Sequence, residues 1–497
     1  MLEGAIPSGF PAGMYARNGP NPYHLTQATR MELGPLSARS APHWFEGDGM
    51  VHAVTFEAGR AAGKPMTATY RNRFVRTAGL AAEKDAGRAL FRPLIDADAG
   101  GMLLSVAANA LNGSVAGKNT ANTSVVAHAG RLLALNEGGC PHVLRADLST
   151  VGEETFGGKL EGTFTAHPKK DPRTGELVFF GTDFLGDKPF ARIGVLGKDG
   201  ELKSQHAIEN GLDVPSLMHD CAATDNYTVL IDVPINSRPE RMGKGESPIQ
   251  FEAGKALRFG VVPRHGPASA VRWLTGEPGM IFHTANAWEE EGGEAIVIRA
   301  MLAPSATITP PSNSDAAYKE WIKTEFVTGN ANVCKLVEIR LDLTAGTVAS
   351  TELPSAESAL MEFPTINPAA AMRDNGFTYA ALLDARTSEA TGAPVYGGLA
   401  KLSHASGGFE KHLHGEGRFG GEPQFVPRGN VHTAAGAGDG SAEDDGWVVT
   451  LVHDEAAGRS EVVIIDAQRF GEGPVCRMAL PQRAPFGLHG TFVPAEA

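Results

Sequence analysis

Cysteine is scarce in this chain. Four cysteines occur in 497 residues, they are far apart, and no two of them form a CxxC pair. Disulfide scaffolds are dense in cysteine, and cysteine zinc sites use closely spaced pairs, so the sequence predicts neither. The pattern is typical of an intracellular protein with reduced thiols. The four residues are Cys140, Cys221, Cys334 and Cys476.

Long basic and long apolar runs are also missing. The formal net charge is −13 and no run is rich in lysine or arginine, so nucleic acid is not a predicted partner. No run of about 18 apolar residues occurs, and nothing is predicted to span a membrane. The first residues, MLEGAIPSGFPAG, lack a basic stretch followed by an apolar one and are not rich in arginine and serine. We therefore predict neither a signal peptide nor a transit peptide.

Glycine and proline, in contrast, are plentiful, at 60 and 32 residues. Turns at such short intervals favour many short strands over long helices. Helices are predicted for residues 103–114 and 314–326. Strands are predicted where β-branched and large apolar residues lie between polar turns, as in RLLALNEGG, ELVFFGTDF, YTVLIDVP, EAIVIRAML, WVVTLVHD and SEVVIIDA.

No low-complexity linker divides the chain, and we interpret residues 1–497 as a single domain. An all-β domain of this size is built most simply as a propeller or a large barrel, because both leave few strand edges exposed. No clean repeat of blade length is visible, so the residues alone do not choose between the two.

Four of the 16 histidines lie between apolar or small residues at the edges of strand-like runs. Their spacings are 52, 64 and 206 residues, and 206 is close to four times 52, which suggests equivalent positions in different blades. We therefore expect them to converge on a central axis. Imidazole is a suitable ligand for iron, zinc, copper and nickel. The four are His167 in FTAHPKKD, His219 in LMHDCAATDNY, His283 in IFHTANAWEEE and His489 in GLHGTF.

An all-histidine metal site needs carboxylates further out, because four neutral imidazoles leave a divalent ion with its full charge. Ligating histidines usually donate their second N–H to such a carboxylate or to a carbonyl. Three glutamates lie in apolar surroundings, where an unpaired carboxylate is costly to bury. They are Glu137 in LALNEGG, Glu362 in LMEFPTINP and Glu422 in GGEPQFVPR.

These motifs belong to a longer series that resembles the carotenoid cleavage oxygenase family, whose members are non-haem iron enzymes that split carbon–carbon double bonds. The series runs nearly from end to end in the family's order. It comprises ARNGPNP (16–22), HWFEGDGMVHAV (43–54), NTSVVAHAGRLLALNEGG (122–139), FTAHP (164–168), MHDCAATDNYTVLID (218–232), FHTANAWEEE (282–291), MEFPTINP (361–368), GEPQFVPR (421–428), AEDDGWVVTLVHD (442–454) and GLHGTFVP (487–494).

The resemblance implies a seven-bladed β-propeller with a dome of loops and short helices over one face. It also implies that the last strand of the chain locks the ring and carries a metal ligand, which places the end of the chain at the centre. The implied cofactor is Fe(II) on the propeller axis. Its implied ligands are His167, His219, His283 and His489.

The resemblance further implies roles for four residues around the ligands. Thr123 falls where the family often has a residue whose methyl group crowds a vacant iron position. His167 has no glutamate partner in this scheme. The implied glutamate partners are Glu137 for His219, Glu362 for His283 and Glu422 for His489.

The implied activity is cleavage of a C=C bond with O2 to give two carbonyl products. The implied substrate is a lipophilic polyene, such as a carotenoid or apocarotenoid, or an aryl alkene. Family members that cleave stilbenes tend to carry a lysine immediately before the first of the three glutamates, whereas this chain has Asn136. This departure favours an apocarotenoid or carotenoid, with cleavage of a stilbene as the alternative.

Such substrates dissolve in membranes, and the resemblance implies docking on a membrane surface through an apolar patch. The implied location is therefore cytoplasmic or peripheral to a membrane. The candidate patch is GGMLLSVAANALNG (100–113), and the alternative is that this helix packs its leucines inward. The apolar residues of the patch are Met102, Leu103, Leu104, Val106 and Leu111.

Two other classes of protein compete with an oxygenase. A propeller that binds a lipophilic ligand without catalysis would lack a histidine or a glutamate of the set, and all seven are present. A zinc or calcium hydrolase would include carboxylates among its ligands, whereas this candidate set is all histidine. Metal analysis combined with measurement of O2 uptake separates the three classes.

Overall fold

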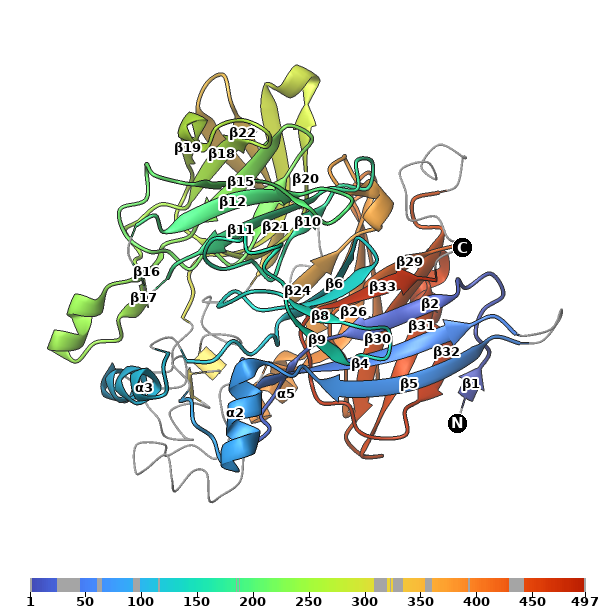
Figure 1. Ribbon diagram of the computed structural model, residues 1–497. Helices are drawn as coiled ribbons and strands as arrows, with labels where there is room; N and C mark the ends of the chain where they lie inside the picture. The colour runs from blue at the N-terminus through green and yellow to red at the C-terminus, as the bar shows by residue number, and fades with distance from the viewer. Residues whose placement is uncertain are drawn as a thin grey trace.

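Seven antiparallel sheets of four or more strands make up most of the computed structural model (Figure 1). The structure describes residues 2–24, 45–59, 65–92, 99–114, 117–184, 186, 188–307, 320–321, 323–324, 334–353, 360–391, 394–428 and 442–495. Each sheet is one blade, and a separate hairpin pairs β16 (Ile235–Ser237) with β17 (Ile249–Phe251). The predicted seven-bladed β-propeller is confirmed.

The two ends of the chain close the ring by joining each other's blades. Blade 1 combines the last strand with N-terminal strands, and blade 7 ends with the first strand of the chain. In Figure 1, β33 lies beside β2. Blade 1 has the order β33 (Gly490–Pro494), β2 (Gly13–Arg17), β4 (Asp48–Glu57) and β5 (Thr67–Phe74), with β3 (Pro20–Asn21) also paired with β4. Blade 7 has β28 (Arg418–Phe419) and β29 (Gln424–Pro427) on β30 (Gly446–Asp454), then β31 (Arg459–Asp466), β32 (Pro474–Ala479) and β1 (Leu2–Gly4).

The five remaining blades follow one another along the chain. Blade 2 contains β6 (Ser124–His128), β7 (Arg131–Leu135), β8 (His142–Leu144) and β9 (Thr150–Glu153). Blade 3 contains β10 (Lys169–Lys170), β11 (Leu177–Thr182), β12 (Ala191–Leu196) and β13 (Leu202–Ala207). Blade 4 contains β14 (Cys221–Ala223), β15 (Tyr227–Asp232), β18 (Arg258–Pro263) and β19 (Arg272–Thr275). Blade 5 contains β20 (Met280–Glu290), β21 (Ala295–Ala303), β22 (Lys335–Asp342) and β23 (Thr347–Glu352). Blade 6 contains β24 (Met361–Thr365), β25 (Phe377–Leu383), β26 (Tyr396–Ser403) and β27 (Gly408–Leu413).

Polarity falls from the outer strands of each blade toward the inner ones. The outer strand β23 is largely exposed and the outer strand β13 is half-buried to exposed, whereas the middle strands β30 and β31 of blade 7 are buried along almost their whole length. A strand covered on both faces carries a continuous apolar run instead of an alternating one. This is why the six apolar runs predicted as strands are found as β7, β11, β15, β21, β30 and β31.

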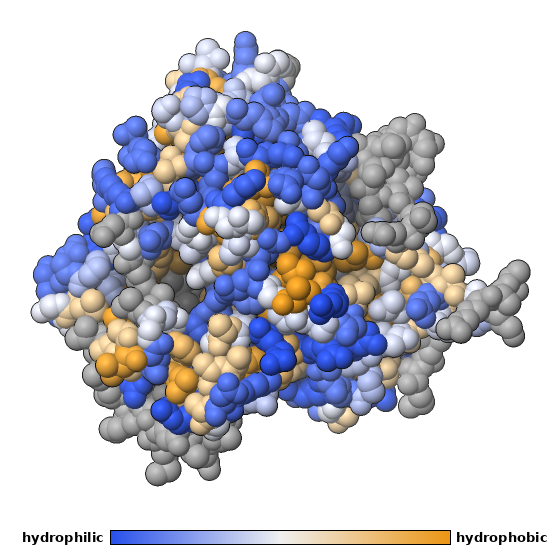
Figure 2. Space-filling model, viewed as in Figure 1, coloured by the Kyte–Doolittle hydropathy of each residue, from blue (hydrophilic) through white to orange (hydrophobic). Residues whose placement is uncertain are grey.

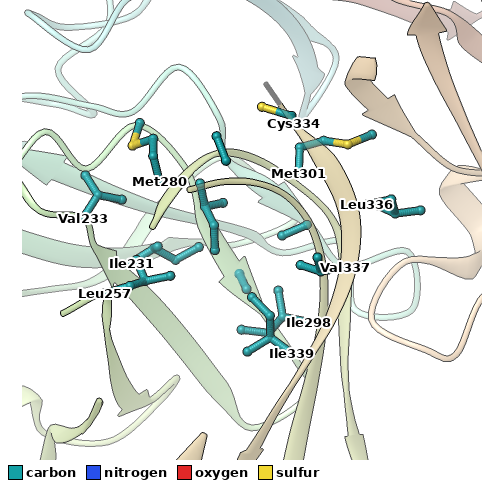
Figure 3. Packing of buried hydrophobic residues seen from close by; sticks show 14 of the residues in the cluster. Ile231, Val233, Leu257, Met280, Ile298, Met301, Cys334, Leu336, Val337 and Ile339 are labelled. Atoms are coloured by element: carbon teal, nitrogen blue, oxygen red, sulfur yellow. The ribbon is translucent and has the colours of Figure 1, made fainter. Parts of the chain in front are cut away.

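Apolar side chains between neighbouring blades form the largest core cluster. Between blades 4 and 5, Ile231 of β15 belongs to the same cluster as Ile298 of β21 and Ile339 of β22 (Figure 3). Burial of such side chains stabilises the fold by roughly 1.5–3 kcal/mol each. Blade faces therefore pack against each other, and the inner strands are carried to the axis.

Helices are few and short in the described residues. The helix α2 (Ala78–Ala86) begins at Thr77, whose hydroxyl accepts a hydrogen bond from the N–H of Leu80, and ends at Gly87 with a φ of 67°. The predicted helix 103–114 is found as α3 (Ala99–Leu111), and the predicted helix 314–326 lies mostly outside the described residues. The remaining helices are α5 (Ala385–Thr391), η1 (Pro239–Lys244), η2 (Ala268–Ala270), η3 (Glu291–Gly293), η5 (Pro368–Ala370) and η7 (Ala467–Glu472).

The helices α2 and α3 lie at one side of the blades. In Figure 1, α2, α3 and the hairpin of β16 and β17 lie on the same side of the picture, at the lower left. The expected dome over one face agrees with this arrangement. Within the described ranges, no helix has both the length and the apolar character needed to cross a bilayer.

Candidate metal centre

Each blade brings one predicted site residue to the start of its innermost strand. Innermost strands of neighbouring blades contact one another, as β14 does with β20 and β33 does with β6. They therefore surround the axis, and residues near their starts face a common point. The residues and strands are Thr123 with β6, His167 with β10, His219 with β14, His283 with β20, Glu362 with β24, Glu422 with β29 and His489 with β33. Glu137 is the exception and follows β7.

The four predicted histidines come together at this point. One ring nitrogen from each lies within 4.8 Å of the other three. The Nε2 atom of His219 is 3.0 Å from that of His167 and 3.3 Å from that of His283. Nitrogen ligands about 2.1 Å from one ion and at right angles to each other are about 3.0 Å apart. The observed spacing therefore matches a set of ligands around a single metal ion.

Three of the histidines face the predicted glutamates with their other nitrogen. The Nδ1 atom of His283 is 2.5 Å from Glu362 Oε2, and Nδ1 of His489 is 2.8 Å from Glu422 Oε1. In the third pair, Nδ1 of His219 is 2.9 Å from Glu137 Oε1. Nδ1 of His283 and Nδ1 of His489 therefore donate their protons to carboxylates, and Nδ1 of His219 is in ion-pair contact with Glu137. This arrangement leaves the Nε2 lone pairs to face the other histidines.

These lone pairs identify the chemistry that the centre supports. A proton can bridge one pair of nitrogens, but a metal ion can satisfy all four at once. Burial and the neighbouring imidazoles lower the pKa of His167 and of His283 well below the usual value, which favours the neutral, ligating form. Burial also lowers the pKa of His219, but Glu137 raises it further, because the carboxylate stabilises positive charge at this imidazole.

The fourth histidine is held differently. In the described part of the chain, no carboxylate oxygen lies within 4.0 Å of a ring nitrogen of His167, in contrast to the other three histidines. Its backbone N–H instead donates to Thr165 Oγ1 at 2.9 Å. His167 therefore depends on the position of its backbone more than on a partner for its ring.

Backbone irregularities aim two of these side chains. Strand β20 changes register on both sides of Thr284, directly after His283, and β24 changes register after Glu362. At this bulge Phe363 has a φ of 57°, a region that non-glycine residues rarely occupy. Its ring stacks on His283 at 5.5 Å between centroids and meets His489 at 5.2 Å. The strain is located where it fixes ligand geometry.

Thr123 and Asn136 lie beside Glu137. The hydroxyl of Thr123 is 3.2 Å from Glu137 Oε2 and accepts a hydrogen bond from Asn136 Nδ2 at 3.2 Å. Asn136 Nδ2 also donates to Asn122 Oδ1 at 3.1 Å. The backbone carbonyl of Thr123 accepts from the N–H of His489 at 3.3 Å. Thr123 is therefore fixed at both its hydroxyl and its backbone, next to one ligand and one glutamate.

Comparison with known proteins agrees with this geometry. The family model described as retinal pigment epithelial membrane protein matches residues 1–494. The carotenoid 9,10(9′,10′)-cleavage dioxygenase 1 of Arabidopsis thaliana is 33% identical over 503 residues, which cover 97% of this chain and 84% of that protein. A chloroplastic 9-cis-epoxycarotenoid dioxygenase of Oryza sativa subsp. japonica is 33% identical over 99% of this chain and 72% of that protein.

The chain belongs to the carotenoid cleavage oxygenase family. It is a dioxygenase of this family with a four-histidine metal site, as the resemblance implied.

Two solved structures show that the fold of this oxygenase is shared along the whole chain. Cobalt-substituted apocarotenoid oxygenase from Synechocystis superposes with a TM-score of 0.80 and 26% identity, over 100% of this chain and 95% of that one. Lignostilbene dioxygenase from Pseudomonas brassicacearum gives a TM-score of 0.79 and 28% identity, over 100% and 94%. The two are similar to this oxygenase to almost the same degree.

The structure adds residues that sequence reasoning missed. Asp220 is fully buried next to His219, and it satisfies the criterion of a carboxylate in apolar surroundings that selected the three glutamates. Phe363 packs on two ligands, and the Cys334 thiol lies 3.6 Å from Glu362 Oε1. No sequence pattern indicates the roles of Phe363 and Cys334, because both contacts depend on tertiary structure.

Replacing two glutamates by glutamine should separate the effect of charge from that of hydrogen bonding. Glu362 Oε2 accepts from both His283 Nδ1 and the Phe363 N–H, so one amide oxygen can keep both bonds. Glu422 accepts from His489 through Oε1 and from the Gly490 N–H through Oε2, so an amide must turn its NH2 toward one donor.

We expect Glu362→Gln to weaken metal binding roughly 10–100-fold while the fold is kept. Glu422→Gln should weaken it further and lower the free energy of unfolding by about 1–3 kcal/mol, because a buried donor loses its acceptor. Metal content after dialysis against a chelator, together with urea unfolding, measures both effects. Wild-type metal retention in both variants would contradict the assignment.

Proposed function

We propose that His167, His219, His283 and His489 bind Fe(II), and that the enzyme cleaves a C=C bond of an apocarotenoid or carotenoid with O2. Each product would receive one oxygen atom as a carbonyl, so both atoms of O2 are used. The observation that carries the proposal is the convergence of four imidazole nitrogens within 4.8 Å, a group that includes no carboxylate from the described residues. Names of similar proteins support it, since they include carotenoid cleavage dioxygenases.

The donor set suits this cofactor. Imidazole binds iron well. The three glutamates supply negative charge from the far side of the imidazole rings, so that a histidine lies between each carboxylate and the ion. Bound Fe(II) would provide the redox chemistry through which O2 reacts with an alkene. The protein's own part is to favour the neutral form of His167 and His283 and to orient three of the rings through Glu137, Glu362 and Glu422.

Apolar rings beside the histidines support a hydrocarbon substrate. Phe282 lies 5.1 Å from the His219 ring, and Phe363 covers His283 and His489. An extended polyene can pack on such rings, whereas a polar substrate would lose hydration without gaining hydrogen bonds.

Asn136 supports a carotenoid-type substrate over a phenolic stilbene. Its amide N–H group is already bonded to Asn122 and Thr123, so it offers neither positive charge nor a free donor to a phenolate. Cleavage of a stilbene is the alternative, and the likeness to lignostilbene dioxygenase favours it.

We also propose that the methyl group of Thr123 crowds a position beside the metal. Its hydroxyl is engaged with Glu137 and Asn136, which leaves the methyl group as the part free to exclude a second small molecule.

Docking on a membrane is a further part of the proposal, with a cytoplasmic or peripheral membrane location. Leu111 at the end of α3 is 90% exposed, and Figure 2 shows hydrophobic surface in the region where Figure 1 places this helix. Val106 is half-buried, and the side chains of Met102, Leu103 and Leu104 lie outside the described residues. An exposed leucine at the end of a helix is well placed to insert into lipid.

The activity is tested with iron-loaded enzyme and a panel of apocarotenoids and stilbenes. We expect aldehyde products in mass spectrometry, one O2 consumed per bond cleaved, and label from ¹⁸O2 in both products. His283→Ala should lose iron and turnover together while keeping its circular dichroism spectrum. Hydrolysis of esters with bound zinc or calcium, or ligand binding without O2 uptake, would instead identify one of the competing classes.

Two variants of Thr123 separate its methyl group from its hydroxyl. Thr123→Ser keeps the hydroxyl and should lower the ratio of aldehyde formed to O2 consumed, because a second small molecule gains access. Thr123→Val keeps a methyl group and should preserve that ratio, while metal retention falls because Glu137 loses a partner. The ratio is measured with an oxygen electrode and chromatography. An unchanged ratio in Thr123→Ser would refute the crowding role.

Membrane docking is tested with Leu111→Ser and phosphatidylcholine vesicles. Losing one buried leucine side chain from lipid costs about 1.5 kcal/mol, so vesicle binding in a sedimentation assay should fall roughly tenfold. Leu413→Ser is the matched control, because Leu413 is 60% exposed but lies on β27, the outer strand of blade 6. Equal binding by wild type and Leu111→Ser would contradict docking through α3.

A further inference from the structure

The sheets alone do not fix the spacing between metal ligands. Hydrogen-bonded ladders run within each blade, and β10, β14 and β20 belong to three different sheets. His167, His219 and His283 are therefore carried by strands that no ladder joins. Their mutual distances must be set by packing and by side-chain contacts across the blade boundaries.

One buried carboxylate joins these three strands. Asp220 follows His219 directly, and its side chain is 1% exposed. Its Oδ1 atom lies 2.7 Å from Lys169 Nζ and accepts from the Cys221 N–H at 2.7 Å. Its Oδ2 atom lies 3.0 Å from the same ammonium and accepts from the N–H of Thr284 at 2.8 Å. The Thr284 hydroxyl is a further partner at 2.9 Å.

Each partner of Asp220 is close in sequence to a different histidine. Lys169 lies two residues after His167, and Thr284 comes directly after His283. The contacts therefore act on the backbone that carries each ligand, in contrast to the three glutamates, which act on imidazole rings. For His167, whose ring has no carboxylate partner in the described residues, this link through Lys169 takes the place of one.

The energetics favour a fixed position for this carboxylate. The buried carboxylate of Asp220 has an ammonium group and several N–H and O–H donors as partners, and a shift of its position would break these bonds. Removal of its charge would leave the Lys169 ammonium without its ion-pair partner. Movement of one strand relative to the next would break these bonds, so the network resists changes in the nitrogen–nitrogen distances.

We propose that Asp220 is a positioning residue that holds His167, His219 and His283 at ligand spacing by bridging blades 3, 4 and 5. The proposal rests on the histidine centre binding a divalent metal, and it is independent of the substrate and of O2.

The test uses Asp220→Asn and the metal alone. Apoprotein is loaded with Co(II), whose visible absorption bands report the arrangement of ligands around the ion. We expect these bands to shift in Asp220→Asn, and loss of cobalt to a chelator to be roughly tenfold faster than in the wild type. Lys169→Met should show a smaller effect in the same direction, and it is also the second variant if Asp220→Asn does not fold. The double variant should resemble Asp220→Asn, because the two residues act through one contact.

Asp232→Asn is the matched control. Asp232 is also 1% exposed and pairs with Arg258, which is 25% exposed, as Lys169 is. Asp232 lies on β15 and Arg258 on β18, so this ion pair stays within blade 4 and crosses no boundary between blades. Asp232→Asn should lower the melting temperature without changing the cobalt bands or the rate of cobalt loss. Lys169→Arg should restore wild-type behaviour, because it preserves the charge pair.

Two results would overturn the proposal. One is a wild-type cobalt spectrum and rate of loss in Asp220→Asn, and the other is equal changes in Asp220→Asn and Asp232→Asn, which would show a general effect on stability. Failure of the proposed function is distinguishable, because wild-type protein would then bind no Co(II), or would bind Co(II) while its iron-loaded form cleaves no alkene. Absence of binding would remove both proposals, whereas absence of cleavage would leave the role of Asp220 intact.

Discussion

Pairing of β33 with β2 is the constraint on which the metal centre depends. His489 precedes β33 directly, and the ladder aligns Gly490 with Arg17. Around the ligand, the Asn18 N–H donates to the His489 carbonyl and the Leu488 N–H donates to the Asn18 carbonyl, both at 2.9 Å. The bonds that close the propeller are thus the bonds that place the fourth histidine. A ligand at the end of the chain cannot reach the axis until both ends have met, so formation of the site is coupled to completion of the ring.

The centre also balances charge in a largely apolar place. Neutral imidazoles cost less to bury than charged groups. The glutamates that orient the imidazoles contact Nδ1, on the opposite side of the ring from the Nε2 atoms that face the metal position. Burial raises the pKa of Glu362 to about 7, and a cation held by the histidines would favour its ionised form. Phe363 covers two of the rings at the expense of an unfavourable φ of 57°. Electrostatics and local strain therefore serve the same geometry.

Sequence predicted the parts of this structure that rest on local pattern. Apolar runs such as WVVTLVHD become buried strands whatever their partners, and the motifs of the family locate the histidines and glutamates. Blade pairing could not be read directly, because insertions obscure the repeat. The 206 residues between His283 and His489 span the three steps from blade 5 to blade 1, not the four that the spacing suggested. The contacts of Asp220 could not be predicted, because its partners Lys169 and Thr284 are 51 and 64 residues away.

Seen from the axis, every boundary between blades is crossed by a hydrogen bond or ion pair at the level of the histidines. Going round the ring from blade 1, the links are His489 N–H to the Thr123 carbonyl, Ser124 Oγ to the Ala166 carbonyl, Lys169 to Asp220, Thr284 to Asp220, His283 to Glu362, Thr365 Oγ1 to the Pro423 carbonyl, and Glu422 to His489. We call these seven links the belt. The hydrogen-bonded ladders run from the axis outward within each blade, so the belt connects neighbouring blades around the axis, where no ladder does. Four blades donate the ligands and the other three carry Thr123, Glu362 and Glu422 at the equivalent position. Three carboxylates of the belt, those of Asp220, Glu362 and Glu422, also position histidines of the metal site. Burial of these carboxylates therefore serves both the contact between blades and the geometry of the ligands.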